Sequence, residues 1–415
     1  MAGYVVEPQR RLAVRDRYDV IVVGGGIAGV AAAVAAAREG AKTCLIEKEY
    51  ALGGLATLGN IIVYLPLCDG MGHKVSAGLA ESLLKLSVRD GSQDSTSGGR
   101  DIPDCWKHAA PIEQRAAQRY ITGFNPATYA LAMEHLALKQ HIELLYDTRF
   151  CGVHKRGDRI DAVIIEDKGG RSALSCKAVI DASGDADVCM AAGETLAHCD
   201  VNVPCGWFYA TDGKKNVELV PHSQDFDFLA RSLPKGSSRG FALRDSRDAS
   251  QMHITSNQEM QKRIGQMRTQ RNDPQIHMLR PPAIASFRMT RRLVGEIELH
   301  EKDDRTFFHD TVGMIGHWRR SGPVYCIPLR ALTGVKTANL MAVGRCMSSA
   351  HDAWDITRVI PACAVTGEAA GAAAAMLIRT GGKALRRLDV PALQHLLKRR
   401  RVILDPRLMA NRAAQ

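Results

Sequence analysis

A glycine-rich turn between an apolar strand and a small-residue helix constrains this chain more than any other feature. The expected strand is Asp19–Val23, and Gly24, Gly26 and Gly29 follow it before an acidic residue, Glu47. Gly24 permits the tight turn, Gly26 lets a pyrophosphate approach the backbone, and Gly29 lets the helix pack closely on a sheet. Free N–H groups and the helix dipole favour negative charge at this helix start. The segment therefore predicts a bound dinucleotide, with Glu47 accepting hydrogen bonds from ribose hydroxyls.

The composition is that of an ordinary soluble globular protein with excess positive charge. Of the 415 residues, 46% are hydrophobic and 24% are charged, enough for about two or three units with their own cores. The formal net charge is +11. Such a charge suits an anionic cofactor or substrate, a nucleic acid or an acidic lipid surface, and it does not choose among them. A merely basic enzyme is the simplest interpretation.

The cysteines indicate reduced thiols. The chain holds 11 cysteines, with no Cys-x-x-Cys pair and no Cys/His grouping at zinc spacing. A dispersed, odd-numbered set is typical of a reducing compartment, so we expect a cytoplasmic protein. The pattern also argues against a metal site, an iron–sulfur cluster and a redox-active dithiol beside the cofactor.

No membrane span is expected. Residues 1–17 are polar and basic and are expected to form a flexible tail rather than a signal peptide. The apolar stretches Tyr18–Ala37 and Val359–Ile378 are each interrupted, the first by three consecutive glycines and the second by Pro361 and Glu368. Both fit a buried helix better than a membrane-spanning one.

The order of the segments predicts an α/β fold with an inserted domain. We expect a Rossmann-like cofactor-binding domain with a central parallel sheet and a small antiparallel sheet, made of residues 18–190 and 334–390. Residues 191–333 are less regular and are expected to form an α+β cap that holds the substrate, and residues 391–415 a C-terminal helix and tail. The expected helices are Ala28–Arg38, Val75–Leu86, Ala127–Gln140 and Pro361–Ile378, with a loop at Ser87–Gly99. The expected strands include Lys42–Ile46, Ile142–Tyr146, Phe150–Lys155, Arg159–Glu166, Arg171–Ser175, Ala178–Ile180 and Asn339–Gly344.

Four glycine-bearing loops recur along the chain. They follow Val23, Leu52, Ala182 and Val343. A nicotinamide dinucleotide needs the first loop only, whereas a longer cofactor that passes several strand ends would contact all four. The repetition favours FAD.

The loops also carry a family resemblance. The chain resembles the FAD-dependent oxidoreductase family of the glutathione-reductase-like flavoprotein fold, from about Tyr18 to Leu404. The matching motifs are Gly53-Gly54-Leu55-Ala56-Thr57, Ile180–Val188, Arg288–Gly295, Asn339–Ser348 and Arg358–Gly371. Together they are specific for the fold and for FAD, and poorly specific for the substrate.

The resemblance implies a set of cofactor contacts. The helix that begins at Pro361 would direct its N-terminus at the flavin pyrimidine ring and stabilise the reduced anion. At Gly344 we expect a backbone contact, with less weight on the Arg345 side chain. The expected cofactor-binding residues are Gly24, Gly26, Ile27, Ala28, Gly29, Glu47, Lys48, Gly53, Gly54, Ala56, Thr57, Phe150, Ala182, Ser183, Gly184, Asp185, Gly344, Arg345, Val359 and Ile360.

Arginines of the cap are candidates for substrate binding. In an extended segment Arg288, Thr290 and Arg292 share one face and Arg291 lies on the other. Arg288 or Arg292 could clamp a carboxylate or another anion. The alternative is that these arginines lie on the surface or form salt bridges to the cofactor domain.

The loop before the last helix holds further candidates. His351 could act as general base, or it could simply stabilise the loop; Arg358 lies in the same region. His73 and Tyr64 are weaker candidates. Cys346 and Cys363, near the expected flavin, fit small buried hydrophobic residues.

The leading hypothesis is a flavoenzyme that moves a hydride or two electrons between a small organic substrate and an acceptor such as oxygen, a quinone or a protein carrier. The substrate could carry an anionic group. A flavin-dependent tRNA-modifying protein and a non-catalytic flavin-bearing subunit are the alternatives. The basic run Lys398–Arg401 fits the solvated face of an amphipathic helix better than a nucleic-acid site. We therefore expect no nucleic-acid partner, and a homo-oligomer is compatible with the sequence.

Overall fold

A five-stranded parallel sheet lies at the centre of the protein. The computed structural model describes residues 3–89, 101–108, 110–199, 202, 204–222 and 240–410. All neighbouring strands of this sheet run parallel, and its central strands are fully buried. Apolar runs such as Val20–Val23 fit this position because the strands are covered on both faces. In spatial order the strands are β18 (Leu340–Ala342), β10 (Ala178–Asp181), β2 (Val20–Val23), β3 (Thr43–Ile46) and β6 (Glu143–Leu145).

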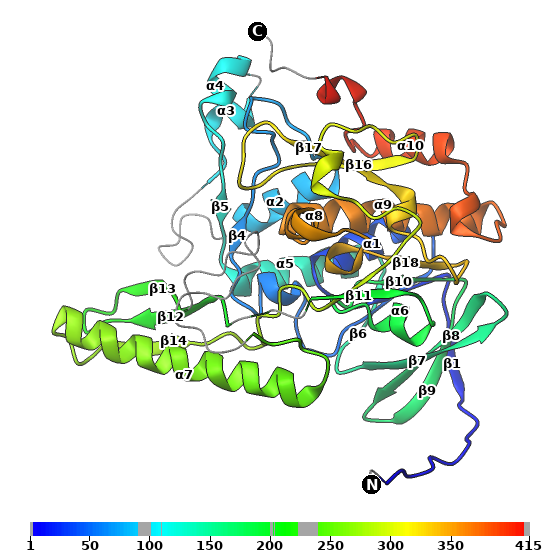
Figure 1. Cartoon of the computed structure of the whole chain (residues 1–415), viewed down its shortest axis with the longest axis horizontal. Coiled ribbons are helices and arrows are strands. Elements are labelled where there is room, and N and C mark those ends of the chain that lie inside the picture. The colour runs from blue at the N-terminus through cyan, green and yellow to red at the C-terminus, as the bar shows by residue number, and fades with distance from the viewer. Residues whose placement is uncertain are drawn as a thin grey trace.

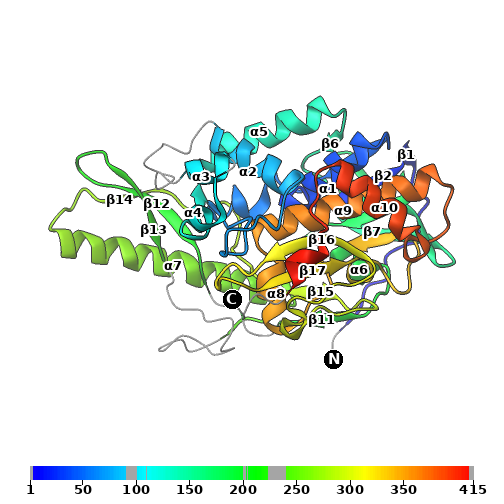
Figure 2. The same ribbon diagram turned by 90° about the horizontal axis from the view of Figure 1, so that it is seen from above.

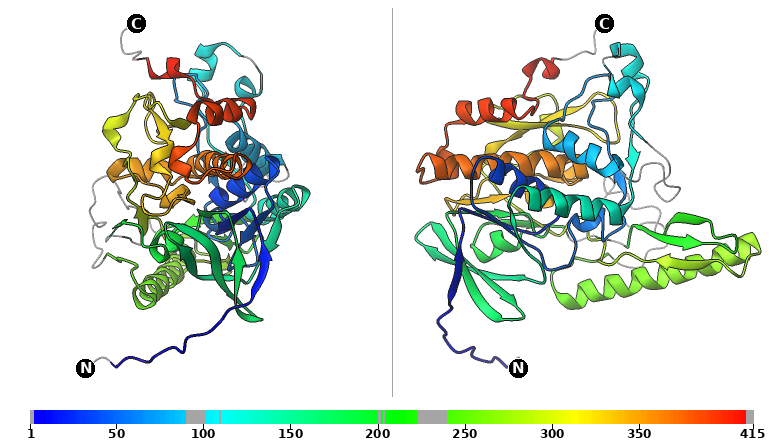
Figure 3. Two further views of the ribbon diagram at one scale, coloured as in Figure 1. Left: turned by 90° about the vertical axis from the view of Figure 1, so that its right-hand side faces the viewer. Right: turned by 180° about the vertical axis from the view of Figure 1, so that it is seen from behind.

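The two faces of the parallel sheet are covered by different layers (Figures 1 and 3). On one face Val20, Val22 and Leu45 pack with helices α1 (Ile27–Arg38) and α9 (Ile360–Arg379). On the other, Ile21 and Ile46 pack with a smaller four-stranded sheet. That sheet is ordered β1 (Val14–Arg17), β9 (Gly170–Ser175), β8 (Arg159–Asp167) and β7 (Arg149–Arg156). The predicted combination of a parallel and a small antiparallel sheet is confirmed.

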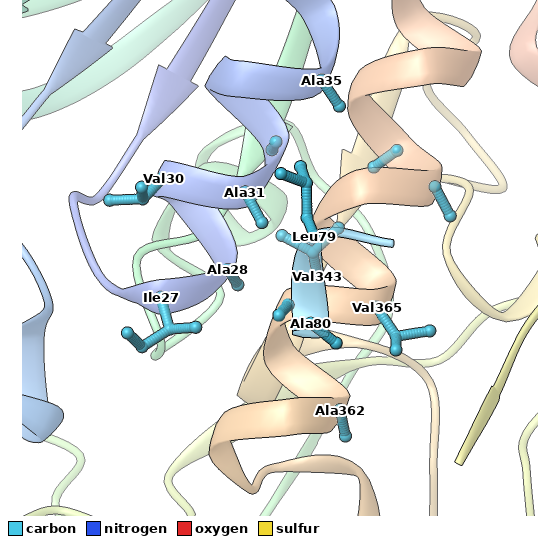
Figure 4. Close-up of a cluster of buried hydrophobic side chains, with 14 of the residues drawn as sticks. Ile27, Ala28, Val30, Ala31, Ala35, Leu79, Ala80, Val343, Ala362 and Val365 are labelled. Carbon is cyan, nitrogen blue, oxygen red and sulfur yellow. The ribbon is translucent and has the colours of Figure 1, made fainter. Parts of the chain in front are cut away.

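Helices α1 and α9 are in backbone contact although they lie more than 300 positions apart in the chain. A Cβ on Gly367 would clash with the Ala28 carbonyl oxygen, and one on Gly371 with that of Ala32. The same order of contacts along both helices means that they run in parallel, with their N-termini together. Alanines of α1 and small residues of α9 face one another across this seam (Figure 4). Among the described residues, α9 is the helix long and apolar enough to cross a membrane, and 94% of its most apolar stretch is buried inside the protein.

The expected cap contains a separate antiparallel sheet and the longest helix. The sheet is ordered β13 (Val217–Pro221), β12 (Trp207–Thr211) and β14 (His277–Arg280), and α7 (Ser246–Arg271) packs along it. Figures 1 and 2 show this unit extending away from the helices around α1 and α9. The hairpin of β16 (Thr311–Gly316) and β17 (Val324–Pro328) instead packs on α9, although it lies in the range expected for the cap.

The remaining elements connect these layers. Helix α5 is capped by the Asn125 side chain, and α10 by the Asp389 side chain. Helix α10 buries Leu393, Leu396 and Leu397, so its predicted amphipathic character is confirmed. The other helices are α2 (Leu79–Arg89), α3 (Asp104–Lys107), α4 (Ile112–Ala116), α5 (Pro126–Lys139), α6 (Asp187–Ala191), α8 (His351–Thr357) and α10 (Val390–Arg399). The other strands are β4 (Val63–Tyr64), β5 (Thr122–Gly123), β11 (Leu196–His198) and β15 (Arg291–Leu293).

Three expectations were wrong in their bounds: the helix Val75–Leu86, the loop that follows it and the N-terminal tail. Helix α2 begins at Leu79, not at Val75, and continues through Ser87 to Arg89, because a carboxylate of α9 accepts the Leu79 N–H and fixes the helix start. The rest of the expected loop, from residue 90, lies outside the described residues. The tail expected over residues 1–17 is shorter, since Val14–Arg17 pairs with β9 as an edge strand.

Candidate active site

Of the four glycines in the first turn, only Gly26 has open space where a side chain would stand. Gly24 has a φ of +102°, and a Cβ there would clash with the backbone of Ala182. A Cβ on Gly29 would clash with the Gly24 carbonyl oxygen, whereas a Cβ on Gly26 would meet nothing within 4 Å. Gly26 is also the N-cap of α1, and no side chain caps this helix. Gly24 and Gly29 thus serve packing, and Gly26 presents free N–H groups to an open site that suits a pyrophosphate.

The second glycine loop lies directly beside the first. The Gly53 N–H donates to the Gly25 carbonyl at 2.8 Å, and a Cβ on Gly54 would stand 3.3 Å from the Gly26 Cα. The Thr57 hydroxyl donates to the Leu52 carbonyl at 2.6 Å, so its side chain closes the loop. The predicted residues Gly53 and Gly54 therefore place a second stretch of backbone without side chains beside the first glycine turn, where the cofactor is expected. Ala56, also predicted, is buried beneath them.

Glu47 lies at the end of β3 and is held by two backbone groups. Its Oε2 accepts from Gly25 N at 2.6 Å and its Oε1 from Glu49 N at 2.9 Å. Burial raises the pKa of the Glu47 carboxyl, and these two hydrogen bonds oppose the shift. Each oxygen keeps a lone pair for a ribose hydroxyl. Lys48 is exposed, and Phe150 is half-buried where β7 begins, beside the same strand end.

The third loop joins the cofactor domain to the cap. The buried carboxylate of Asp181 accepts from the Ser183 hydroxyl at 2.6 Å and from Cys189 N at 2.9 Å, which fixes the loop that includes Ala182. Asp185 accepts from the Thr290 hydroxyl of the cap at 2.5 Å. The side chain of Asp185 is therefore engaged by the cap.

Arg345 also contacts the cap rather than leaving its charge free for the cofactor. Its guanidinium lies over Gly184, donates to the Phe287 carbonyl, and lies 3.4 Å from Asp185. A contact between the Arg345 side chain and the cofactor stays a prediction.

The fourth loop brings the starts of α1 and α9 together. Gly344 has a φ of +62°, and its N–H donates to the Thr366 hydroxyl at 3.0 Å. A Cβ on Gly344 would stand 2.9 Å from the Ala28 Cβ of α1 and 3.2 Å from the Cys363 Sγ of α9. Helix α9 has Val359 as N-cap, and like α1 it lacks a side-chain cap. Two uncapped N-termini side by side, one for phosphates and one for a flavin ring, fit a cofactor of the length of FAD.

The predicted residues at the start of α9 differ in accessibility. Ile360 is half-buried, and Val359 is buried. Burial raises the pKa of the Cys363 thiol to about 11. The thiol therefore stays protonated at neutral pH, in agreement with its interpretation as a small apolar residue.

The cap arginines show the predicted alternation. Arg288, Thr290 and Arg292 are buried, and Arg291 is half-buried and pairs with Asp187 at 2.5 Å. Arg292 is neutralised by Glu298 at 2.5 Å and stacks on Trp354, with 5.3 Å from its guanidinium carbon to the ring centroid.

Arg288 has a different environment. Its Nε donates to the Cys205 Sγ at 3.1 Å, and its guanidinium carbon lies 5.9 Å from the Trp207 ring centroid. Within the part of the chain that the structure describes, no carboxylate lies within ion-pair distance of Arg288. Arg288 is therefore a buried cation without a counter-ion among the described residues.

Arg358 lies near Arg288 and shares a carboxylate with another arginine. Asp355, 2% exposed, forms an ion pair with Arg358 through Oδ1 and with Arg319 at 3.1 Å through Oδ2. Burial lowers the pKa of Arg358; Asp355 opposes this shift, and the positive charge of Arg288 adds to it. The sequence reasoning missed Asp355 and Cys205. The signal for Asp355 was its position three residues before Arg358 on one short helix.

The remaining candidates are His351, His73 and Tyr64. His351 is exposed at the start of α8, with its ring 5.5 Å from that of His300, so its role as general base stays a prediction. His73 pairs with Asp69 at 3.0 Å. The buried Tyr64 hydroxyl donates to the Ala80 carbonyl at 2.6 Å, which indicates a structural role.

Comparisons with known proteins agree with this geometry. The family described as FAD dependent oxidoreductase matches residues 19–202 and 248–397. The chain is 30% identical over 169 residues to a digeranylgeranylglycerophospholipid reductase of Methanocaldococcus jannaschii, which covers 41% of this chain and 38% of that protein. It is 35% identical over 74 residues to a thioredoxin reductase of Ureaplasma parvum, with 18% and 24% covered. The chain thus spans less than half the length of each of these curated relatives.

Among the solved structures that resemble this one is a geranylgeranyl bacteriochlorophyll reductase-like protein of Thermoplasma acidophilum. It aligns over 93% of this chain and 84% of its own, with 16% sequence identity and a TM-score of 0.46. The family match covers both segments that are expected to build the cofactor site, from the first glycine turn to helix α9. The chain belongs to the FAD-dependent oxidoreductase family.

Proposed function

We propose that this oxidoreductase transfers two electrons between FAD and a small organic substrate whose anionic group is bound by Arg288 and Arg358. The observation that carries this proposal is the buried Arg288, which has no counter-ion among the described residues. A buried charge is costly unless it is paired, so an anionic ligand would relieve the cost. A guanidinium is suited to a carboxylate because both are planar and can form two parallel hydrogen bonds.

The surrounding residues support such a role by positioning the two arginines. Asp355 holds Arg358 from one side, and the Trp207 ring lies near Arg288. Arg358 immediately precedes the N-cap of α9, which lies where the flavin ring is expected. Bound FAD supplies the two-electron chemistry, while these residues would bind and orient the substrate against it. The two curated relatives described above are named reductases. Reduction of the substrate is therefore to be tested as well as its oxidation.

The charge-neutralising variant Arg288→Gln tests the anion site. Acetate and butyrate should perturb the visible flavin spectrum of the FAD-loaded wild type in a saturable way. Loss of a charge-assisted contact should weaken their binding by about tenfold or more. Arg291→Gln is the matched control, because Arg291 lies on the opposite face of the same segment and pairs with Asp187. Equal affinity of the wild type and Arg288→Gln would refute the proposal.

The location of the protein, its electron acceptor and the alternative of a tRNA substrate are also open to test. We propose a reducing compartment, the cytoplasm, as the location, because all 11 cysteines are free thiols. Oxygen, a quinone and a protein carrier remain the proposed acceptors, and the rate at which each reoxidises the reduced flavin discriminates among them. A tRNA substrate would require RNA binding that weakens steeply with salt, and its absence in a filter-binding assay is the expected result.

A further inference from the structure

The tip of the β16–β17 hairpin carries two consecutive arginines around a buried histidine. His317 is 1% exposed, and its Nδ1 accepts from Arg319 N at 3.1 Å and from Arg320 N at 3.2 Å. The Arg320 Nε lies 3.1 Å from the other ring nitrogen, and Arg119, between α4 and β5, donates to the His317 carbonyl. Three guanidinium groups from two separate segments therefore lie around one histidine.

Negative charge does not balance these arginines. Asp355 pairs with Arg319 at 3.1 Å, but the same carboxylate also pairs with Arg358. In the part of the chain that the structure describes, neither Arg119 nor Arg320 has a carboxylate within ion-pair distance. Like charges held close together repel one another, so an anion bound at the hairpin tip would relieve this repulsion.

His317 does not satisfy the Arg320 side chain. Burial lowers the pKa of His317 to about 4, with Arg320 and the other two arginines adding to the shift and Asp355 opposing it, so the ring is neutral at pH 7. A neutral imidazole has a single acceptor nitrogen. If Nδ1 accepts from the two backbone N–H groups, Nε2 carries the proton and cannot accept from Arg320. The Arg320 guanidinium thus lacks a fixed partner.

The guanidinium groups can be reached from solvent. Arg320 is exposed, and the Arg319 side chain is 27% exposed. Arg119 is half-buried, and its Nη1 has no hydrogen-bond partner among the described residues and keeps accessible surface. The exposed Ser321 lies close to Arg119, because a Cβ on Gly70 would clash with the Ser321 Oγ and stand 3.0 Å from the Arg119 Cδ. A hydroxyl donor is therefore present beside the arginines.

This combination of donors suits a phosphate group. A phosphate carries roughly two negative charges at neutral pH and several acceptor oxygens. Guanidinium groups match its geometry and can each form two parallel hydrogen bonds with it. A carboxylate has one charge and two oxygens, so it would leave part of the arginine cluster unpaired.

We propose that Arg119, Arg319 and Arg320 bind the phosphate group of a small reactant of this enzyme. The position supports a reactant, since Asp355 joins Arg319 at the hairpin tip to Arg358 of the proposed substrate site. Two reactants could carry the phosphate: the organic substrate itself, or a nicotinamide dinucleotide phosphate that donates electrons to the flavin. The inference goes beyond the proposed function, which depends on Arg288.

Pyrophosphate is the probe for this site. It is titrated by calorimetry into the FAD-loaded protein at constant ionic strength, and one saturable site is expected. Arg119→Gln and, independently, Arg320→Gln should each weaken binding by about fivefold or more, because each removes a charge-assisted contact. Arg319 is left intact because it pairs with Asp355. Arg399→Gln is the matched control, since Arg399 is exposed in the basic run of α10, and it should bind pyrophosphate like the wild type.

Two further reactants distinguish the source of the phosphate. In the absence of oxygen, NADPH would lose a hydride to become NADP+, and the flavin would take up this hydride and one proton. Faster bleaching by NADPH than by NADH, with the preference lost in Arg320→Gln, assigns the phosphate to the electron donor. A saturable change of the flavin spectrum with butyl phosphate, weakened in Arg320→Gln, assigns it to the substrate.

The outcomes separate this site from the proposed function. Absence of saturable pyrophosphate binding, or an equal loss in Arg399→Gln, overturns the phosphate site. Loss of pyrophosphate binding in Arg288→Gln with full binding in Arg119→Gln and Arg320→Gln would also overturn it, because the anion would then lie at Arg288. If Arg288→Gln changes neither carboxylate nor pyrophosphate binding and the other two variants lose pyrophosphate, the phosphate site stands and the proposed function fails.

Discussion

Glu368 provides the sharpest prediction about stability. It lies within α9, is 3% exposed, and its Oε2 accepts from Leu79 N at 2.7 Å at the start of α2. Burial raises the pKa of Glu368 from 4.5 to about 7, against the opposing effects of the Leu79 N–H, Arg38 and Arg400. The folded protein therefore holds this proton over a pH range in which the unfolded chain has released it.

The sign and size of the effect follow from this difference. Because the folded state binds more protons between pH 4.5 and about 7, the stability contributed by Glu368 falls as pH rises through this window. A gap of roughly 2.5 pH units, at 1.36 kcal/mol per unit, corresponds to about 3 kcal/mol. Glu368→Gln removes the titration and keeps an oxygen that accepts the Leu79 N–H. The variant should thus gain up to about 3 kcal/mol relative to the wild type between pH 4.5 and pH 8.

Urea unfolding of FAD-saturated protein at pH 5, 6, 7 and 8 measures this difference. Glu113→Gln is the control, because Glu113 is exposed on α4 and its variant should follow the wild type at every pH. A difference between Glu368→Gln and the wild type that does not change with pH would refute the reasoning. A variant that loses stability relative to the wild type as pH rises would show that the Leu79 N–H and the arginines outweigh burial.

Two further predictions concern the cofactor and the arginine pair. Gly26→Val should lower FAD affinity by more than tenfold, because the new side chain would enter the space expected for the pyrophosphate, and it should leave the stability of the FAD-free protein unchanged, because it meets no protein atoms. Equilibrium dialysis measures the affinity, with Gly265→Ala in α7 as the control. An unchanged affinity would mean that Gly26 does not lie along the pyrophosphate. Asp355→Ala should cost about 3–5 kcal/mol in urea unfolding, since two arginines lose their shared carboxylate. A cost below about 1 kcal/mol, the value of an exposed pair, would mean that solvent screens these charges.

The cofactor domain could be predicted from the sequence because its constraints are local. A turn such as Gly24–Gly29 requires glycine at fixed spacing for steric reasons that hold within a few residues. The apolar strand Val20–Val23 and the alanines of α1 likewise carry their own pattern. The four glycine loops are distant in the chain, but their proximity could also be predicted, because one long ligand would have to contact all of them.

The cap and the polar partners could not be predicted in the same way. The Leu79 N–H, at the start of α2, donates a hydrogen bond to Glu368, which lies 289 positions further along the chain. Arg358 is neutralised by the carboxylate of Asp355. A single aspartate belongs to no repeating sequence pattern that would mark it as this partner. Such contacts depend on tertiary packing, which periodicity does not encode.

The backbone contact between α1 and α9 also sets an order of events during synthesis. Helix α1 lies within the first forty residues, but its partner surface at Gly367 and Gly371 is near the end of the chain. Contacts of such sequence separation form late, because the intervening chain must first be closed into a loop. A growing chain would thus carry the phosphate turn long before the flavin end exists. FAD would be captured only once α9 has been translated, so cofactor loading would report that synthesis has passed this helix.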